Sequence, residues 1–170
     1  WYGLIDSVIN WENDGHEMQT KLDPTGKRIW AHNFNLDKIF LVHGGWSDIS
    51  SKGNFFRFYP NGFLFTSNAV FAEEQVIPIL IAYGNSNLVQ SLIGLLNPTM
   101  HFTPGNFNTL PFESKKIIQE SIKLLSNQNI SISKSDWDAH ETSWDFKENE
   151  LVRIFNDNGW GTLDIVVSEY

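Results

Sequence analysis

The spacing of hydrophobic residues changes about half-way along the chain. Up to Glu73, apolar and aromatic residues occur in short runs separated by turn residues, whereas beyond it they recur three and four residues apart. Short runs are typical of strands, and the longer spacing is typical of amphipathic helices. The pattern therefore predicts an α+β fold, in which an N-terminal β-rich unit is followed by helices that pack against it.

The strongest β signal is a pair of aromatic runs, Phe55–Tyr59 and Phe63–Thr66, which flank Pro60-Asn61-Gly62. An Asn-Gly pair between two such runs predicts a β-hairpin with a tight turn. Because the runs are rich in Phe, we expect most of these aromatic side chains to lie in the core.

The rest of the N-terminal half is also expected to be mainly β structure. Ile39–His43 predicts a strand that ends at Gly44-Gly45. Residues 13–28 are polar and contain two turn signals, Asp14-Gly15 and Asp23-Pro24-Thr25-Gly26. This stretch therefore predicts turns ahead of the sheet.

Helical spacing begins after Glu73 and runs from Ile77 to Leu96. Gly84-Asn85-Ser86 either breaks this stretch into two short helices or lies inside a single one. Asn97-Pro98 is a helix stop, and the amide-rich residues Thr99–Thr109 predict an ordered loop.

Three further elements are expected towards the C-terminus. Pro111 suits a first helical turn and predicts a helix that continues to Leu125. Lys147–Asn156 predicts another helix, and Leu163–Val167 has strand character.

The acidity of the chain is concentrated at its C-terminal end. The net charge is −8, yet residues 1–132 carry 11 acids against 9 bases, whereas residues 133–170 carry 9 acids against 3 bases. We therefore divide the chain into a domain over 1–132 and an acidic segment over 133–170, packed on it or leading to a next domain. Since DNA affinity comes mainly from bases that neutralise phosphates, the chain alone is expected to bind DNA weakly.

Composition narrows the class of protein further. The longest apolar run, Val76–Tyr83, contains Pro78 and is far shorter than the roughly 20 residues of a membrane span, so no membrane partner is expected. The chain has no cysteine, which excludes disulfides and fits a bacterial cytoplasmic protein. It begins at Trp1, which favours a piece of a longer protein.

Catalytic and metal-binding motifs are not found, so we assign no catalytic, cofactor-binding or metal-binding residue. Asn97-Pro98-Thr99-Met100 resembles an amino-methyltransferase turn only superficially, because Thr99 and Met100 replace the second Pro and the stacking aromatic residue. Asp145-Phe146-Lys147, downstream of Asp136 or Asp138, matches the residue types of a magnesium-dependent nuclease motif. A solvent-exposed acidic face explains these residues better. The histidines show no ligand spacing and are interpreted as surface or half-buried residues.

The functional candidate that remains is the polar rim of the predicted hairpin. Arg can pair with guanine and Asn with adenine, whereas Lys suits phosphates. On this ground the candidate DNA contacts are Lys52, Asn54, Arg57, Asn61 and Asn106. For Asn61 a turn role alone is sufficient, and for Arg57 or Lys52 a plain surface role is the alternative.

A series of short blocks follows one order along almost the whole chain. The blocks are Trp1-Tyr2-Gly3, Asn10–Gly15, Arg57–Phe63, Asn85-Ser86, Asn97-Pro98-Thr99, Leu110-Pro111-Phe112, Asp136-Trp137-Asp138 and Glu141–Phe146. In this order the chain resembles the adenine-specific DNA methyltransferases of bacteriophage-exclusion (BREX) and phage-growth-limitation systems, in which such blocks follow the catalytic domain. It departs from them at Asn87, where Lys is common, and at Asn106, where Asp is common.

The resemblance implies that this chain is the target-recognition region of an enzyme that methylates adenine N6. It implies double-stranded DNA as the partner of the parent enzyme, other BREX proteins as further partners, and S-adenosylmethionine as the cofactor of a catalytic domain outside this chain. The chain alone is expected to be inactive, and the blocks are interpreted as scaffold.

Two other functions stay open. The acidic segment over 133–170 suits a protein-interaction module that docks partner subunits of a defence complex. Exposed aromatic residues suit a carbohydrate-binding module. A DNA titration at several salt concentrations separates the first hypothesis from these two, because phosphate contacts are salt-dependent.

Overall fold

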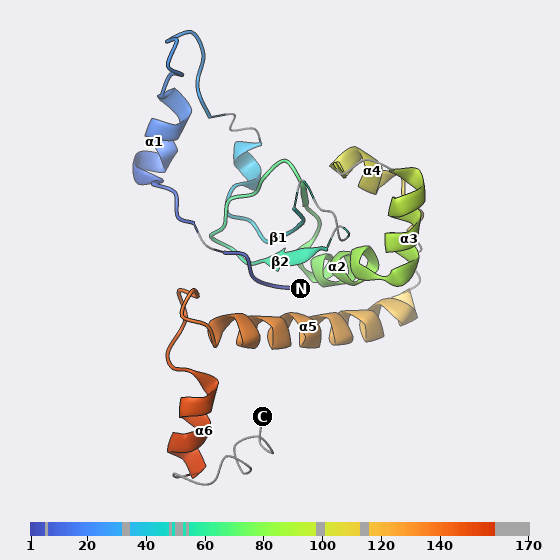
Figure 1. Ribbon diagram of the computed structural model, residues 1–170. Helices are drawn as coiled ribbons and strands as arrows, with labels where there is room; N and C mark the ends of the chain where they lie inside the picture. The colour runs from blue at the N-terminus through green and yellow to red at the C-terminus, as the bar shows by residue number, and fades with distance from the viewer. Residues whose placement is uncertain are drawn as a thin grey trace.

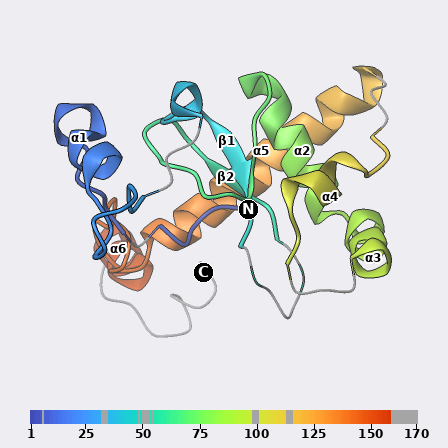
Figure 2. The same ribbon diagram turned by 90° about the horizontal axis from the view of Figure 1, so that it is seen from above.

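The chain folds around a small antiparallel sheet, with α2 packed on it and the long helix α5 running beneath both (Figures 1 and 2). The computed structural model describes residues 1–5, 7–31, 35–47, 49, 53, 55–97, 101–112 and 116–158. Strands and helices lie in the same unit, which confirms the predicted α+β class.

The sheet has three short strands in the order β2-β1-β3. The central strand β1 (His43–Gly45) pairs antiparallel with β2 (Arg57–Tyr59) on one side and β3 (Ala69–Val70) on the other. Glycine is required at the centre of β1, because a Cβ atom on Gly44 would lie 3.0 Å from Val70 Cγ1. The strand can therefore lie close to both β3 and α2.

The predicted hairpin is wrong, although its turn is present. Residues 61–62 form a turn, but Phe63–Thr66 is not a strand, and β2 pairs with β1 instead. The amide of Gly62, which has a positive φ of 96°, donates to the carbonyl of Phe40 at 3.0 Å. The chain after the turn is thus directed away from β2, and β1 takes the place of the expected partner.

The N-terminal half is less rich in β structure than predicted. The strand expected over Ile39–His43 begins only at His43, because Phe40 adopts a left-handed φ of 67° that an extended strand cannot accommodate. A 3-10 helix, η1 (Leu36–Lys38), precedes it. The polar stretch after residue 12 includes the helix α1 (Glu12–Thr20), whose first turn is left-handed at Asn13. The turn expected at residues 23–26 is present, with Gly26 N–H bonded to Asp23 O.

Two helices account for the apolar stretch after Glu73. A 3-10 turn, η2 (Glu74–Val76), leads into α2 (Ile77–Asn85), and α3 (Asn87–Leu96) follows at a bend of 66°. Ser86 causes the break, since it is extended and its hydroxyl caps α3 by accepting from Val89 N–H. Of the two arrangements left open by the sequence, the broken helix is therefore the one observed.

The C-terminal helices differ from the prediction mainly in their bounds. The stretch expected to be a loop contains the short helix α4 (Pro104–Asn108), and Pro111 precedes rather than opens the long helix α5 (Lys116–Asp138). Helix α6 (Glu150–Asn158) matches the helix expected at 147–156, shifted by about one turn. The strand predicted at 163–167 lies outside the described residues, and the domain division at 132, which falls within α5, stays a prediction.

The core lies between the sheet, α2, α3 and α4. Its buried residues are Val42, Trp46, Phe56, Ile77, Ile81, Val89, Ile93, Phe102, Phe107 and Leu110. Trp46 packs against Phe56 with ring centroids 4.8 Å apart, and its indole N–H donates to the carbonyl of Phe102 at 2.6 Å. Trp46 therefore anchors the core.

Helix α5 is fixed to this core through α2. The hydroxyl of the buried Ser126 donates to the carbonyl of Pro78 at 2.6 Å, in the first turn of α2. Within the described residues, no single helix has the length and apolar character needed to cross a membrane, although α2 with η2 and α3 pass that test together as a bent pair.

Candidate functional site

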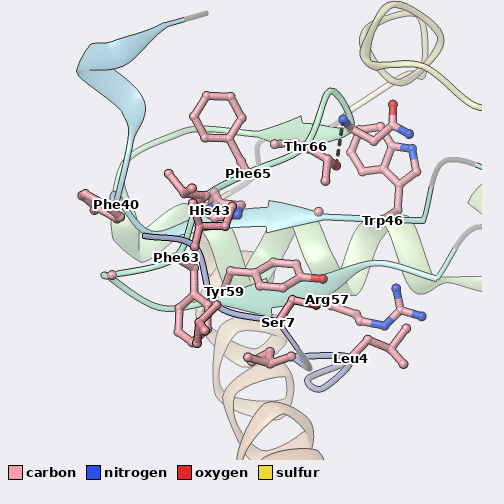
Figure 3. Close-up of a pocket in the computed structure, with 18 of the residues that line it drawn as sticks. Leu4, Ser7, Phe40, His43, Trp46, Arg57, Tyr59, Phe63, Phe65 and Thr66 are labelled. Carbon is pink, nitrogen blue, oxygen red and sulfur yellow. Dashed lines mark hydrogen bonds between the residues drawn. The ribbon is translucent and has the colours of Figure 1, made fainter. Parts of the chain in front are cut away.

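A groove of about 720 Å³ opens on the face of the sheet that carries His43 and Tyr59 (Figure 3). Three segments far apart in sequence form its walls: the extended N-terminal stretch Leu4–Trp11, strands β1 and β2, and the loop from Gly62 to Ala69. Trp144 and Asp145, from the turn after α5, also line it. The groove is thus built by the fold as a whole, and no local sequence motif marks it.

The alternation of side chains along the paired strands determines which residues face the groove. His43 lies opposite Tyr59, and Gly45 lies opposite Arg57, so these positions share one face of the sheet. Because Gly45 has no side chain, Tyr59 approaches to within 3.1 Å of where its Cβ would be. A larger residue at position 45 would push Tyr59 into the groove.

Aromatic rings form most of the apolar wall. Tyr59 is stacked on His43 at a centroid distance of 5.0 Å and an interplanar angle of 11°, and Phe63 lies 6.3 Å from Tyr59. Phe65 meets His43 edge-on at 6.1 Å. Figure 3 shows these rings at one end of the groove and Arg57 at the other.

His43 is buried and is held in one tautomer. It is only 2% exposed, and this burial lowers its pKa, an effect that its hydrogen bond to Leu41 partly opposes. Nδ1 lies 2.9 Å from the carbonyl of Leu41, which can only accept, so Nδ1 carries the proton. Nε2 is therefore left as a hydrogen-bond acceptor at the groove wall.

Arg57 supplies the positive charge of the groove. Its guanidinium donates to the hydroxyl of Ser47 at 3.2 Å, and no carboxylate among the described residues pairs with it. Asp145, which also lines the groove, is bonded to Lys134 at 3.0 Å. Arg57 is thus half-buried, and its guanidinium is positioned by Ser47 at the groove.

Lys134 ties three segments together below the groove. Its ammonium bonds Asp138 and Asp145 and lies 5.4 Å from the ring of Tyr2. Hydrogen bonding to Asp138 raises the pKa of Lys134. Burial would raise the pKa of Asp138, but its bonds to Lys134 and Ser143 hold that pKa below its usual value. Asp138 and Asp145 of the suspected nuclease motif are therefore engaged in an ion-pair cluster, and no possible metal site is found among the residues that the structure describes.

Of the other predicted DNA contacts, Asn61 and Asn106 do not line the groove with Arg57. Asn61 is exposed at its turn and lines a separate, smaller cavity beside Lys38 and Leu41. The side chain of Asn106 accepts from the amide and hydroxyl of Thr103 in a capping box at the start of α4. Lys52 and Asn54 lie outside the described residues.

Two known proteins match this chain over most of its length. It is 39% identical over 155 residues to the adenine-specific methyltransferase PglX of Lacticaseibacillus casei (strain Zhang) and 34% identical over 157 residues to the adenine-specific methyltransferase BrxX of Escherichia coli O9:H4 (strain HS). The chain is similar to one segment of BREX adenine-specific methyltransferases. Each match covers 89% of this chain but only 13% and 12% of the relatives' lengths, and no family model matches.

This similarity confirms the family resemblance inferred from the ordered blocks. The structure also explains several of them as structural elements. The side chain of Asn85 accepts from the amide of Phe56 at 2.8 Å and donates to its carbonyl at 2.9 Å. It thus satisfies both main-chain groups of Phe56, as a neighbouring β-strand would do. Ser86 caps α3, and Asn97 donates to the carbonyl of His101, which closes the loop after α3. These blocks therefore act as structural links within the fold.

The residues that sequence reasoning missed are His43 and the N-terminal stretch from Leu4 to Ile9. The sequence placed His43 on the surface or half-buried, and the stretch carries no motif. Because His43 becomes a groove residue only through its register with Tyr59, no local signal identifies it.

Proposed function

We propose that this chain is the DNA-target-recognition segment of a site-specific DNA adenine-N6 methyltransferase in a phage-defence system. The observation that carries the proposal is the similarity to PglX and BrxX over 89% of the chain. The groove with Arg57 supports it, because a guanidinium on a rigid strand can pair with a guanine edge or a phosphate. Double-stranded DNA is then the partner of the whole enzyme, which we place in the cytoplasm.

The chemistry of methyl transfer belongs to the rest of such an enzyme. S-adenosylmethionine is commonly held by a glycine-rich turn between a strand and a helix. Here β1, which contains Gly44 and Gly45, is followed by β2 rather than by a helix. We therefore expect the cofactor and the catalytic residues outside this chain, and the chain alone to be inactive.

The experiment that tests this function is an exchange of the segment between two enzymes of different specificity. The segment matching residues 1–158 is swapped, and methylated adenines are mapped by sequencing genomic DNA. Methylation is expected at the target of the enzyme that donated the segment. If it stays at the target of the recipient, the proposal is wrong.

A second candidate function is a docking module for the remainder of the enzyme or for other BREX proteins. It is favoured by large apolar side chains that the helices expose on this chain, among them Leu88 and Leu95 of α3 and Leu124 and Ile132 of α5. In a binding assay with those proteins, Leu88→Glu combined with Leu95→Glu would abolish association if α3 is the interface. Methylation specificity, in contrast, would be unchanged in any enzyme that still assembles.

A further inference from the structure

We propose that the groove holds one unpaired nucleotide, with its base against the aromatic wall and its phosphate on Arg57. This inference rests on the proposed function, since we take the nucleotide to come from a DNA strand. A free nucleotide presents the same chemistry, and the experiment below distinguishes the two sources.

The size of the groove fits a single small ligand. Its volume of about 720 Å³ lies within the roughly 300–1,000 Å³ that is usual for small-molecule sites. Such sites combine apolar and aromatic walls with a few placed polar groups, as this groove does. Bases in a duplex are already stacked on each other, so only an unpaired base can offer its face to a protein ring.

The aromatic wall can hold a base without reading its identity. Every base has a π face, and stacking on protein rings is tolerant of sequence. Tyr59, Phe63 and Phe65 are all half-buried, so each keeps part of its ring open. The ring of Tyr59 is stacked on that of His43, which limits the orientations that Tyr59 can adopt.

Two polar groups lie where a nucleotide carries complementary ones. Nε2 of His43 is an acceptor that suits an N–H group of a base, and the structure gives it no partner among the described residues. Arg57 lies on the neighbouring strand β2, opposite Gly45. Its guanidinium offers hydrogen-bond donors for a phosphate. The acceptor and the donors therefore lie at separate points of one face, as a base and its phosphate do.

Among the charged residues that line the groove, Arg57 is the one that can attract an anion. Asp145 shares Lys134 with Asp138, so its charge is only partly compensated, whereas Arg57 has no acidic partner in the described part of the chain. The chain as a whole has a net charge of −8, so non-specific attraction of phosphates to it is weak. Binding of a small phosphate compound therefore reports on the groove.

The test is a titration of the 170-residue chain with mononucleotides, monitored by tryptophan fluorescence, because Trp11, Trp46 and Trp144 line the groove. The ligands are dAMP, dGMP, dCMP and TMP, with adenosine and deoxyribose 5-phosphate as partial ligands. Saturable quenching by the mononucleotides is expected, with weaker binding of both partial ligands. Flat titrations would overturn the proposal.

Three variants locate the site. Arg57→Met is expected to weaken mononucleotide binding by about tenfold or more, since a charge-assisted hydrogen bond is lost. Arg28→Met is the matched control, because Arg28 is exposed and pairs with Asp23 away from the groove. Ser7→Phe fills the groove from its exposed rim and provides a test that does not depend on the folding of an altered strand. If all three variants bind like the wild type, the groove is not the site.

Two comparisons separate the sources and the two proposals. A single-stranded oligonucleotide that binds more tightly than dAMP supports a DNA source, and a preference for AMP over the oligonucleotide excludes it. If the segment exchange moves methylation specificity but no nucleotide binds, this inference fails and the proposed function stands. If nucleotides bind but specificity does not move, the proposed function fails.

Discussion

Replacing Asn85 tests the link between the end of α2 and the residue that enters β2. Its side chain makes two hydrogen bonds, at 2.8 and 2.9 Å, with the main chain of Phe56, which is 0% exposed. Asn85→Ala leaves both main-chain groups unpaired. Each buried unpaired group costs about 1–3 kcal/mol, so we expect the free energy of unfolding to fall by about 2–5 kcal/mol.

The measurement is urea unfolding followed by tryptophan fluorescence and circular dichroism, with Asn87→Ala as control. Asn87 lies two residues away, is exposed, and its substitution should change the free energy of unfolding by less than about 0.5 kcal/mol. The isosteric Asn85→Asp adds a second criterion. Its carboxylate accepts from the amide of Phe56 but repels the carbonyl, whereas the protonated acid can both accept and donate.

The deficit of Asn85→Asp relative to the wild type should therefore shrink as the pH falls below the range in which the carboxyl group is ionised, about pH 4 for an ordinary Asp. If Asn85→Ala costs no more than Asn87→Ala, the two bonds do not support the fold. The interpretation of the Asn85-Ser86 block as scaffold would then be wrong.

Three further changes follow from single contacts. In thermal unfolding, Gly84→Ala should lower the free energy of unfolding by about 1–3 kcal/mol, since the new Cβ would lie 2.6 Å from the ring of Phe56. Gly94→Ala, which faces open space on α3, should instead raise it by up to about 1 kcal/mol. His43→Phe should remove part of the loss of stability that the wild type shows below about pH 6.5. The reason is that the unfolded His takes up a proton there more readily than the folded one, whose pKa is lowered by burial. Urea unfolding at several pH values measures this difference. Lys134→Met should cost about 1 kcal/mol at low salt and less at high salt, because the ammonium is 41% exposed and its ion pairs are partly screened.

Each of these has an outcome that contradicts it. Equal effects of the two glycine substitutions would mean that Phe56 is free to move aside. Parallel stability curves for the wild type and His43→Phe across pH 5–8 would mean that folding does not lower the pKa of His43. A cost of Lys134→Met that does not depend on salt would assign its role to packing of the side-chain stem.

Periodic helices were predictable, and strand pairing was not. The apolar spacing of 77–96 identified α2 and α3, and the possibility of a break at Ser86 was visible because an N-cap residue stood there. The prediction of a hairpin was wrong because β2 pairs with β1, which is only three residues long and contains two glycines. A sequence pattern does not identify so short a strand. The choice between partners is made by tertiary packing, which a run of aromatic residues does not encode.

The same limit applies to the groove and to the long helix. Arg57, a candidate from the sequence, lines the groove, and its role there stays a prediction; its neighbour His43 became visible only through register. The second half of α5 is rich in Ser and Asn, which are weak helix formers, so its sequence favours a loop. Its contacts with the rest of the fold, such as Ile130 packed against the core and Lys134 paired with Asp145, override that preference.

The way the first residues are held has a consequence for the synthesis of the protein. The carbonyl of Trp1 accepts from Phe58, Tyr2 faces Lys134, and Gly3 lies so close to the ring of Trp137 that a Cβ would be 2.9 Å from it. During synthesis this stretch emerges before all of these partners, and Lys134 and Trp137 become available only when α5 has been translated. In a nascent chain that ends before Lys134, residues 1–3 lack their contacts with α5, and the edge of β2 at Phe58 is not held in place. We expect chaperones and proteases to act on such a partly folded chain. The slow step of folding is expected to be the seating of residues 1–3, the contact that spans the longest stretch of chain.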